Sequence, residues 1–66
     1  MGSNAVKKTR EEHLMSRAEL ARKAGISFQT LVRVERGETC RLETKRKILL
    51  ALGYDLSERK KLYQEE

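Results

Sequence analysis

The 66-residue sequence contains no proline, no tryptophan and a single cysteine, Cys40. One cysteine cannot form a disulfide within the chain and cannot supply the ligands of a zinc site, so a reducing, intracellular setting is the simpler expectation. No apolar run approaches the roughly 20 residues that cross a bilayer, and no hydrophobic signal segment follows Met1. We therefore expect a soluble, cytoplasmic protein with no membrane partner.

Strand patterns are also missing. No stretch alternates polar and apolar residues with a period of two, whereas a content of 38% charged residues suits a compact all-α domain. A chain of this length forms one domain with a small core. We interpret residues 1–5 as a flexible N-terminus or tag remnant and residues 6–66 as the folded domain.

The sequence shows no arrangement of residues that performs chemistry. It contains no nucleophile paired with a base, no glycine-rich phosphate loop and no paired carboxylates in an apolar frame. His13 is the one histidine, and no cluster of ligands or acids surrounds it in the sequence, which favours an ordinary residue at a helix end. We expect no enzyme activity, no metal and no cofactor.

Positive charge is what the sequence has in excess. A net charge of +5 and a pI near 9.7 indicate an acidic partner, most commonly nucleic acid, although solvated surfaces alone can produce such a balance. Residues 28–47 carry six Lys or Arg and three Glu, a net charge of +3. Much of the excess positive charge therefore lies between residues 28 and 47.

The most strongly patterned part of the sequence is residues 16–37, which predict two short helices joined by a tight turn. Ser16 and Glu19 form the pattern of a capping box, and Gly25 can take the left-handed conformation that ends a helix. Ser27 is the next N-cap, so a second helix is predicted over residues 28–36. A turn this short makes the helices cross steeply, which is helix-turn-helix geometry, and we expect Ala21 and Gly25 to lie where their backbones approach.

Three further helices are predicted around this pair. The first covers residues 6–14, with His13 and Leu14 in approximate apolar register. A fourth follows a Thr44 cap and stops at Gly53, and a short charged helix covers residues 57–63. In the loop before the fourth helix we expect Cys40 to be a small half-buried hydrophobe; the alternative is an exposed thiol whose pKa the neighbouring Arg41 lowers.

Four pieces of the sequence together resemble the phage repressor and Cro type of helix-turn-helix, also called xenobiotic-response-element-like (XRE) regulators. They are Arg10, then SRAELARKAGIS at residues 16–27, VERG at residues 34–37 and ILLALG at residues 48–53. The resemblance covers residues 6–56 and implies a five-helix, repressor-like domain that binds a specific double-stranded DNA sequence as a transcriptional regulator. Members of this family often carry glycine near position 14, where this chain has Leu14.

The resemblance also implies which residues read bases. The helix at residues 28–36 would enter the major groove, with Phe28, Gln29 and Arg33 at base-reading positions and Thr30 close by. Gln29 can pair with adenine and Arg33 with guanine, whereas we expect Phe28 to touch a thymine methyl or to turn back onto the protein. An exposed Phe28 at the start of the helix is the odd alternative. The alternative for the polar residues is a face that keeps the helix soluble.

Two further sets of residues follow from the same resemblance. The residues expected to bind DNA phosphates are Arg17, Arg36, Arg41 and Lys45, each of which could instead be an ordinary exposed cation. Arg10 and Glu35 match an arginine and a glutamate that pair in this family, and such an ion pair would orient the first and third helices.

The expected partners are double-stranded DNA and, less directly, a second copy of the chain. Leu56, Leu62 and Tyr63 could be buried in a homodimer, placing two half-sites of a palindrome roughly 34 Å apart, or could dock onto the protein's own core. The rival interpretation is a protein-interaction module, such as an antitoxin-like partner, with secondary DNA binding. Phe28 and Val32 support it, because two apolar residues on this helix could fill a protein groove.

Overall fold

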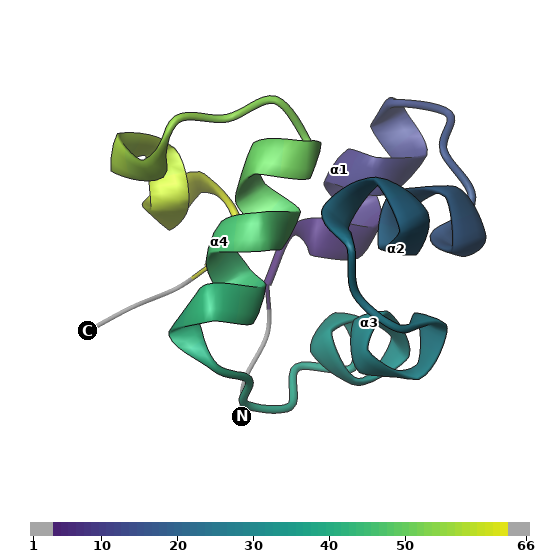
Figure 1. Cartoon of the computed structure of the whole chain (residues 1–66). Helices are drawn as coiled ribbons and strands as arrows, with labels where there is room; N and C mark the ends of the chain where they lie inside the picture. Colours follow the sequence, from purple (N-terminus) through teal and green to yellow (C-terminus); the bar gives the residue numbers. More distant parts are fainter. Residues whose placement is uncertain (1–3, 64–66) are drawn as a thin grey trace.

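The computed structural model describes residues 4–63 and contains five helices (Figure 1). They are α1 (Val6–Glu12), α2 (Arg17–Ala24), α3 (Phe28–Glu35), α4 (Leu42–Ala51) and the 3-10 helix η1 (Leu56–Lys61). This confirms the all-α, five-helix prediction. None of the helices in the described part of the chain has the length and apolar character needed to cross a bilayer.

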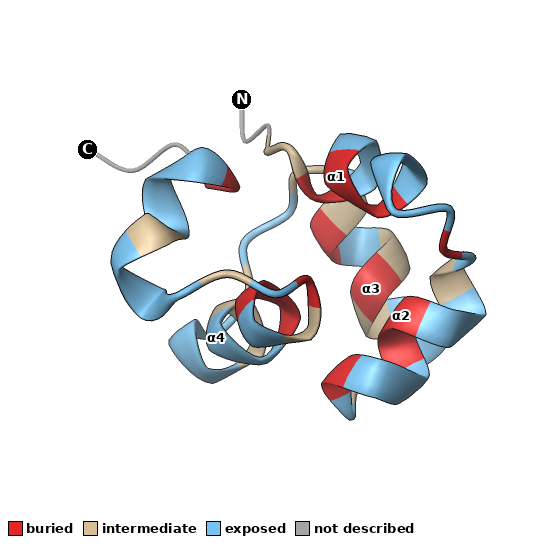
Figure 2. Ribbon diagram, turned by 90° about the horizontal axis from the view of Figure 1, so that it is seen from above, coloured by how far each residue is buried: buried red, intermediate tan, exposed pale blue. Residues whose placement is uncertain are grey.

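The core lies where the inner faces of the helices meet, and α2 packs against both α3 and α4. In Figure 2 each α-helix shows buried residues on one side and exposed residues on the other, as expected for amphipathic helices around a small core. The fully buried side chains are Val6, Leu20, Leu31, Val34, Ile48, Leu49 and Leu62.

Serine side chains cap the two central helices, and at α2 the structure shows the serine half of the predicted capping box. The Glu19 amide donates to Ser16 Oγ at 3.1 Å, which caps α2, and the Thr30 amide donates to Ser27 Oγ at 3.1 Å, which caps α3. The Ser27 hydroxyl also donates to Thr30 Oγ1 at 2.7 Å. Only residues 25–27 therefore separate the end of α2 from the start of α3.

All four α-helices end with the same pair of backbone hydrogen bonds, the Schellman motif. The residue that takes the left-handed conformation is Gly25 after α2 (φ 71°), Gly37 after α3 (φ 90°) and Gly53 after α4 (φ 87°). After α1 it is Leu14, with φ 56°, the one non-glycine residue with positive φ in residues 4–63. This conformation costs an L-residue about 1–2 kcal/mol relative to right-handed helix.

Gly25, in the turn after α2, is needed there for its left-handed backbone conformation and not for close packing. A Cβ placed at Gly25 would meet nothing within 4 Å, so the expectation that Gly25 permits a close approach of two backbones is wrong. Ala21 is buried in the core as expected.

The predicted end of the first helix and the predicted start of the fourth are wrong. Helix α1 ends at Glu12, and the side chains of His13 and Leu14 are exposed instead of lying in apolar register. Helix α4 begins at Leu42, because the extended backbone of Arg41 (φ −69°, ψ 153°) provides its N-cap without any side-chain hydrogen bond. Thr44 therefore lies inside the first turn of α4 and does not cap it.

The C-terminal segment is a 3-10 helix that begins one residue earlier than predicted. Asp55 and Glu58 form a capping box, in which the Asp55 amide donates to the Glu58 carboxylate at 2.8 Å. Leu62 and Tyr63, which follow η1, are buried in the protein's own core, so these two side chains are not available to a second copy. Leu56 remains half-exposed.

Of residues 1–5, interpreted as a flexible start or tag remnant, residues 1–3 lie outside the described part, and Asn4 and Ala5 form hydrogen bonds with the rest of the fold. The Ala5 amide donates to the Leu62 carbonyl at 2.7 Å, and Asn4 forms a β-bridge with Tyr63. Asn4 Nδ2 also donates to the Val34 carbonyl at 2.8 Å. These bonds tie the entry of α1 to the C-terminal segment and to α3.

Candidate nucleic-acid interface

A buried carboxylate at the end of α3 holds three helices together. Glu35 accepts from Arg10 Nε at 2.7 Å and Nη2 at 3.3 Å, and from Arg17 Nε at 3.0 Å. The side chains of Arg10 and Glu35 are only 8% and 3% exposed, whereas that of Arg17 is 41% exposed. Because Arg10 lies on α1 and Arg17 on α2, this cluster fixes α3 relative to both helices.

The same arginine of α1 also satisfies a buried backbone group. Arg10 Nη1 donates to the Met15 carbonyl at 2.8 Å, in the turn between α1 and α2. A buried guanidinium is tolerated only when its donors are used, and here they are divided between the carboxylate and this carbonyl.

Helix α3 presents one face to the core and another to solvent. Leu31 and Val34 are buried, and they anchor the helix on its inner side. The outer side carries a shallow hollow of about 360 Å³, lined by Phe28, Gln29, Val32, Arg33 and Arg36. A rigid helix therefore displays a polar, cationic face with two apolar side chains.

The structure resolves the position of Phe28, for which the sequence left a thymine contact, packing back onto the protein, or an exposed ring at the helix start. Phe28 is 50% exposed and lines the outer hollow, so its side chain does not turn back into the core. An exposed aromatic ring beside Gln29 is available for contact with a partner, such as a thymine methyl group.

A second hollow, of about 410 Å³, lies between α3, the loop after it and the start of α4. Its lining residues are Thr30, Arg33, Val34, Thr39, Cys40, Arg41 and Thr44. Arg33 lines both hollows and so lies at the centre of this surface. The structure thus brings Thr30, Arg33 and Arg41 together, although Arg41 belongs to a different element.

The four residues expected to contact phosphates have different surroundings. Arg17 is partly committed to Glu35, and Arg36 is a surface residue that pairs with Glu38 at 3.7 Å. Lys45 lines neither hollow beside α3, and its Nζ is 5.4 Å from the centroid of the Tyr63 ring, although it lies near Cys40 in the lining of the second hollow. The structure therefore groups Arg36 and Arg41 with the base-reading candidates, whereas Lys45 lines neither of the two hollows.

Cys40 is half-buried against the core, as the first of the two interpretations predicts. Burial raises the pKa of its thiol, and the nearby Lys45 ammonium opposes this effect only in part. A thiol with a raised pKa is a poor nucleophile at neutral pH, which disfavours a reactive cysteine.

Sequence reasoning missed two contributors to this surface. It gave Arg17 a phosphate-binding role only, whereas the side chain also pairs with Glu35, 18 positions away in the sequence. It left Asn4 out of the fold, although its amide supports the α3 backbone at Val34. An asparagine close to a chain end gives no local signal for such a contact.

Comparison with known proteins agrees with this geometry. The profile of the helix-turn-helix family matches residues 6–59, which includes all four α-helices. No curated protein matches the chain. Since the matched region spans most of the sequence, the chain belongs to the helix-turn-helix family, in the group of repressor and Cro type regulators.

Proposed function

We propose that this protein binds a specific double-stranded DNA sequence as a transcriptional regulator, with α3 in the major groove. Membership of the helix-turn-helix family supports a DNA-binding regulatory role in general. The observation that carries the more specific proposal is the outer face of α3, where Gln29 and Arg33 are exposed on a helix whose other side is anchored in the core.

The chemistry of this face suits recognition of base edges. The Gln29 amide offers one donor and one acceptor to adenine, and the Arg33 guanidinium offers two donors to guanine. Each such pair contributes about 1–3 kcal/mol of discrimination against the wrong base. Phe28, at the start of the helix, supplies an apolar contact for a thymine methyl.

Cations around this face would fix the position and orientation of the protein on the DNA duplex. Arg36 and Arg41 border the two hollows, and the exposed part of Arg17 lies at the beginning of α2, where backbone amides also favour an anion. Phosphate contacts of this kind bring affinity without sequence information, and they make binding depend on salt.

The test is a selection of random duplex DNA by the purified chain, followed by titration of the enriched site at two salt concentrations. Gln29→Ala and Arg33→Ala should each lose preference at one or two base pairs. Lys60→Ala, which removes one exposed charge from η1, is the control and should keep the preference of the parent.

The rival function is a protein-interaction module, which the exposed Phe28 and the half-buried Val32 on the same face would serve. The two functions differ in salt dependence, because an apolar protein contact does not release counterions. If no sequence is enriched and both α3 variants bind DNA like the parent, base recognition by this helix is wrong and a protein partner should be sought.

A further inference from the structure

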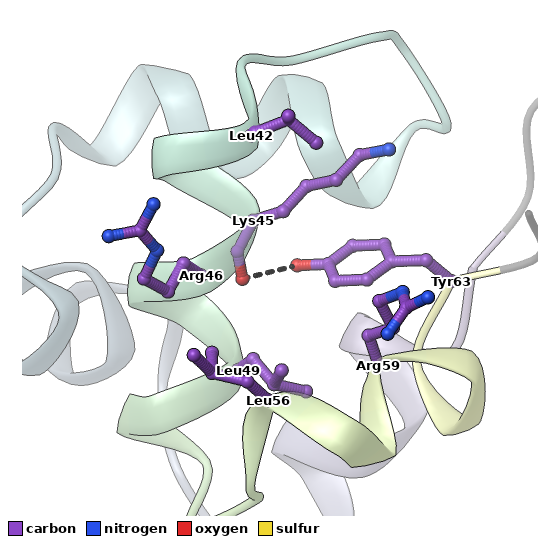
Figure 3. A pocket seen from close by; sticks show the side chains of 7 residues that line it. All are labelled: Leu42, Lys45, Arg46, Leu49, Leu56, Arg59 and Tyr63. Carbon is purple, nitrogen blue, oxygen red and sulfur yellow. Dashed lines mark hydrogen bonds between the residues drawn. The ribbon is translucent and has the colours of Figure 1, made fainter.

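A groove separates α4 from η1 on a part of the surface that includes no residue of α3. It has a volume of about 190 Å³ and is lined by Leu42, Lys45, Arg46, Leu49, Leu56, Arg59 and Tyr63 (Figure 3). Leu49 and Tyr63 are buried and form its inner wall, whereas Leu42 is 75% exposed and Leu56 is 50% exposed. The groove thus has an apolar interior that solvent reaches.

The rim of this groove is cationic. Lys45 and Arg46 extend from α4 and Arg59 extends from η1, and among residues 4–63 no acidic side chain lines the groove. Pockets for small-molecule ligands usually measure about 300–1,000 Å³, so this groove is small for a drug-sized molecule. Its size and chemistry suit an apolar side chain that carries acidic neighbours.

The chain presents such a side chain at the turn between α1 and α2. Leu14 is 93% exposed and is held there by a backbone with φ 56°. The two residues at the end of α1, Glu11 and Glu12, are also exposed. An apolar side chain with two carboxylates close by in sequence is complementary in charge to the groove between α4 and η1.

We propose that Leu14 of one copy inserts into the α4–η1 groove of a second copy, with Glu11 and Glu12 facing Arg46. The α1–α2 turn and η1 lie at opposite sides of the molecule in both Figure 1 and Figure 2. The contact therefore joins two different surfaces and is head-to-tail, unlike a symmetric dimer. A head-to-tail contact that does not close into a ring continues into an open chain.

The groove and the outer face of α3 have no lining residue in common. Successive copies in the open chain are related by one repeated rotation and translation, with no two-fold axis between neighbours. DNA sites occupied by neighbouring copies would then be direct repeats rather than the two halves of a palindrome. The contact itself needs no DNA, so it can be tested independently of the proposed function.

The test is sedimentation analysis of the full chain without DNA, up to about 1 mM protein, where even a weak contact is populated. The mass of the parent should rise continuously with concentration. Leu14→Gly removes the inserted side chain and fits the left-handed backbone, and Leu56→Asp places a carboxylate in the groove. Each variant alone should remain monomeric, and circular dichroism should show the helical content of the parent.

Mixing the two variants gives the decisive measurement. Leu14→Gly keeps an intact groove and Leu56→Asp keeps an intact Leu14, so an equimolar mixture should form a discrete 1:1 complex that grows no further. Leu50→Asp is the matched control, because Leu50 is 53% exposed on α4 but does not line the groove. This variant should associate like the parent.

Three results would overturn the proposal. The first is a parent protein that stays monomeric at the highest concentration. The second is a Leu14→Gly variant that still forms a dimer, as expected if the groove makes a symmetric contact. The third is a mixture of the two variants that fails to associate although both are folded.

Discussion

The Arg10 guanidinium donates to the Glu35 carboxylate at 2.7 Å, and this ion pair joins α1 to the end of the helix proposed to read DNA. Both side chains are almost completely buried. A buried ion pair is weak evidence for stability by itself, since desolvation offsets much of the attraction between the charges. The ion pair instead fixes the orientation of α3, because this helix cannot rotate about its axis without breaking hydrogen bonds to two other helices.

We expect Glu35→Gln to destabilise the fold by about 3–5 kcal/mol, because it leaves the buried Arg10 without a countercharge. Arg17→Ala should cost much less, about 1 kcal/mol or below, since the Arg17 side chain is 41% exposed and water replaces its contact. Urea denaturation followed by circular dichroism measures both. Equal losses in the two variants would show that the pair of Arg10 and Glu35 has no special role.

Leu14→Gly should stabilise the monomer by about 1 kcal/mol. Glycine adopts the left-handed conformation without the penalty paid by leucine, and the almost fully exposed side chain gives up little burial when it is removed. Thermal or urea denaturation at micromolar protein, where self-association is negligible, measures the change. A loss of stability would mean that Leu14 makes contacts within the folded chain.

Gly25→Ala is the converse substitution. Its added Cβ meets nothing within 4 Å, so only the backbone conformation at φ 71° opposes it. We expect a loss of about 1 kcal/mol, opposite in sign to the change at Leu14. If Gly25→Ala is neutral, the left-handed conformation carries little cost in this fold and the gain expected from Leu14→Gly should vanish as well.

The parts of the fold that depend on local chemistry could be predicted from the sequence. Ser16 and Ser27 each cap a helix through an amide three residues away, and Gly53 ends α4, because these effects involve neighbours in the chain. The two wrong helix boundaries have no such local cause. Leu14 takes a glycine-like conformation where the turn leads into the buried Met15, and Arg41 precedes α4 without a capping side chain.

The site could be predicted only in part for a similar reason. The resemblance placed Arg10 opposite Glu35, and the structure pairs them. The approach of Arg17 to the same carboxylate and the position of Lys45 beside Tyr63 each join residues 18 positions apart. Such contacts depend on how the helices pack, and no periodicity or motif in the sequence predicts them.

Salt dependence should separate the proposed phosphate contacts. Arg36→Ala should reduce the slope of log K against log salt by about 1, because Arg36 borders the outer face of α3. Lys45→Ala removes the same charge from the groove beside Tyr63 and should leave the slope close to that of the parent. Fluorescence anisotropy on the selected duplex at several salt concentrations gives both slopes. A larger change for Lys45→Ala would place the DNA over α4 instead.

Alkaline pH should destabilise the fold through Tyr63. Burial raises the pKa of this phenol above its ordinary value of 10, so the neutral form is favoured in the folded state. Below pH 10 both states are neutral at this site and stability does not depend on it. Above pH 10 the unfolded chain ionises first, and the free energy of unfolding falls by about 1.4 kcal/mol per pH unit.

Tyr63→Phe removes this dependence. The variant loses the hydrogen bond from the phenol to the Lys45 carbonyl, which is long at 3.3 Å, so below pH 10 it should be less stable than the parent by about 1 kcal/mol or less. Above pH 10 the parent loses stability faster, and the two curves should cross. Urea denaturation at intervals from pH 8 to pH 11.5, with Tyr54→Phe as the control for removal of a phenol, measures the difference. A gap between Tyr63→Phe and the parent that stays constant with pH would show that the buried phenol does not titrate differently in the two states.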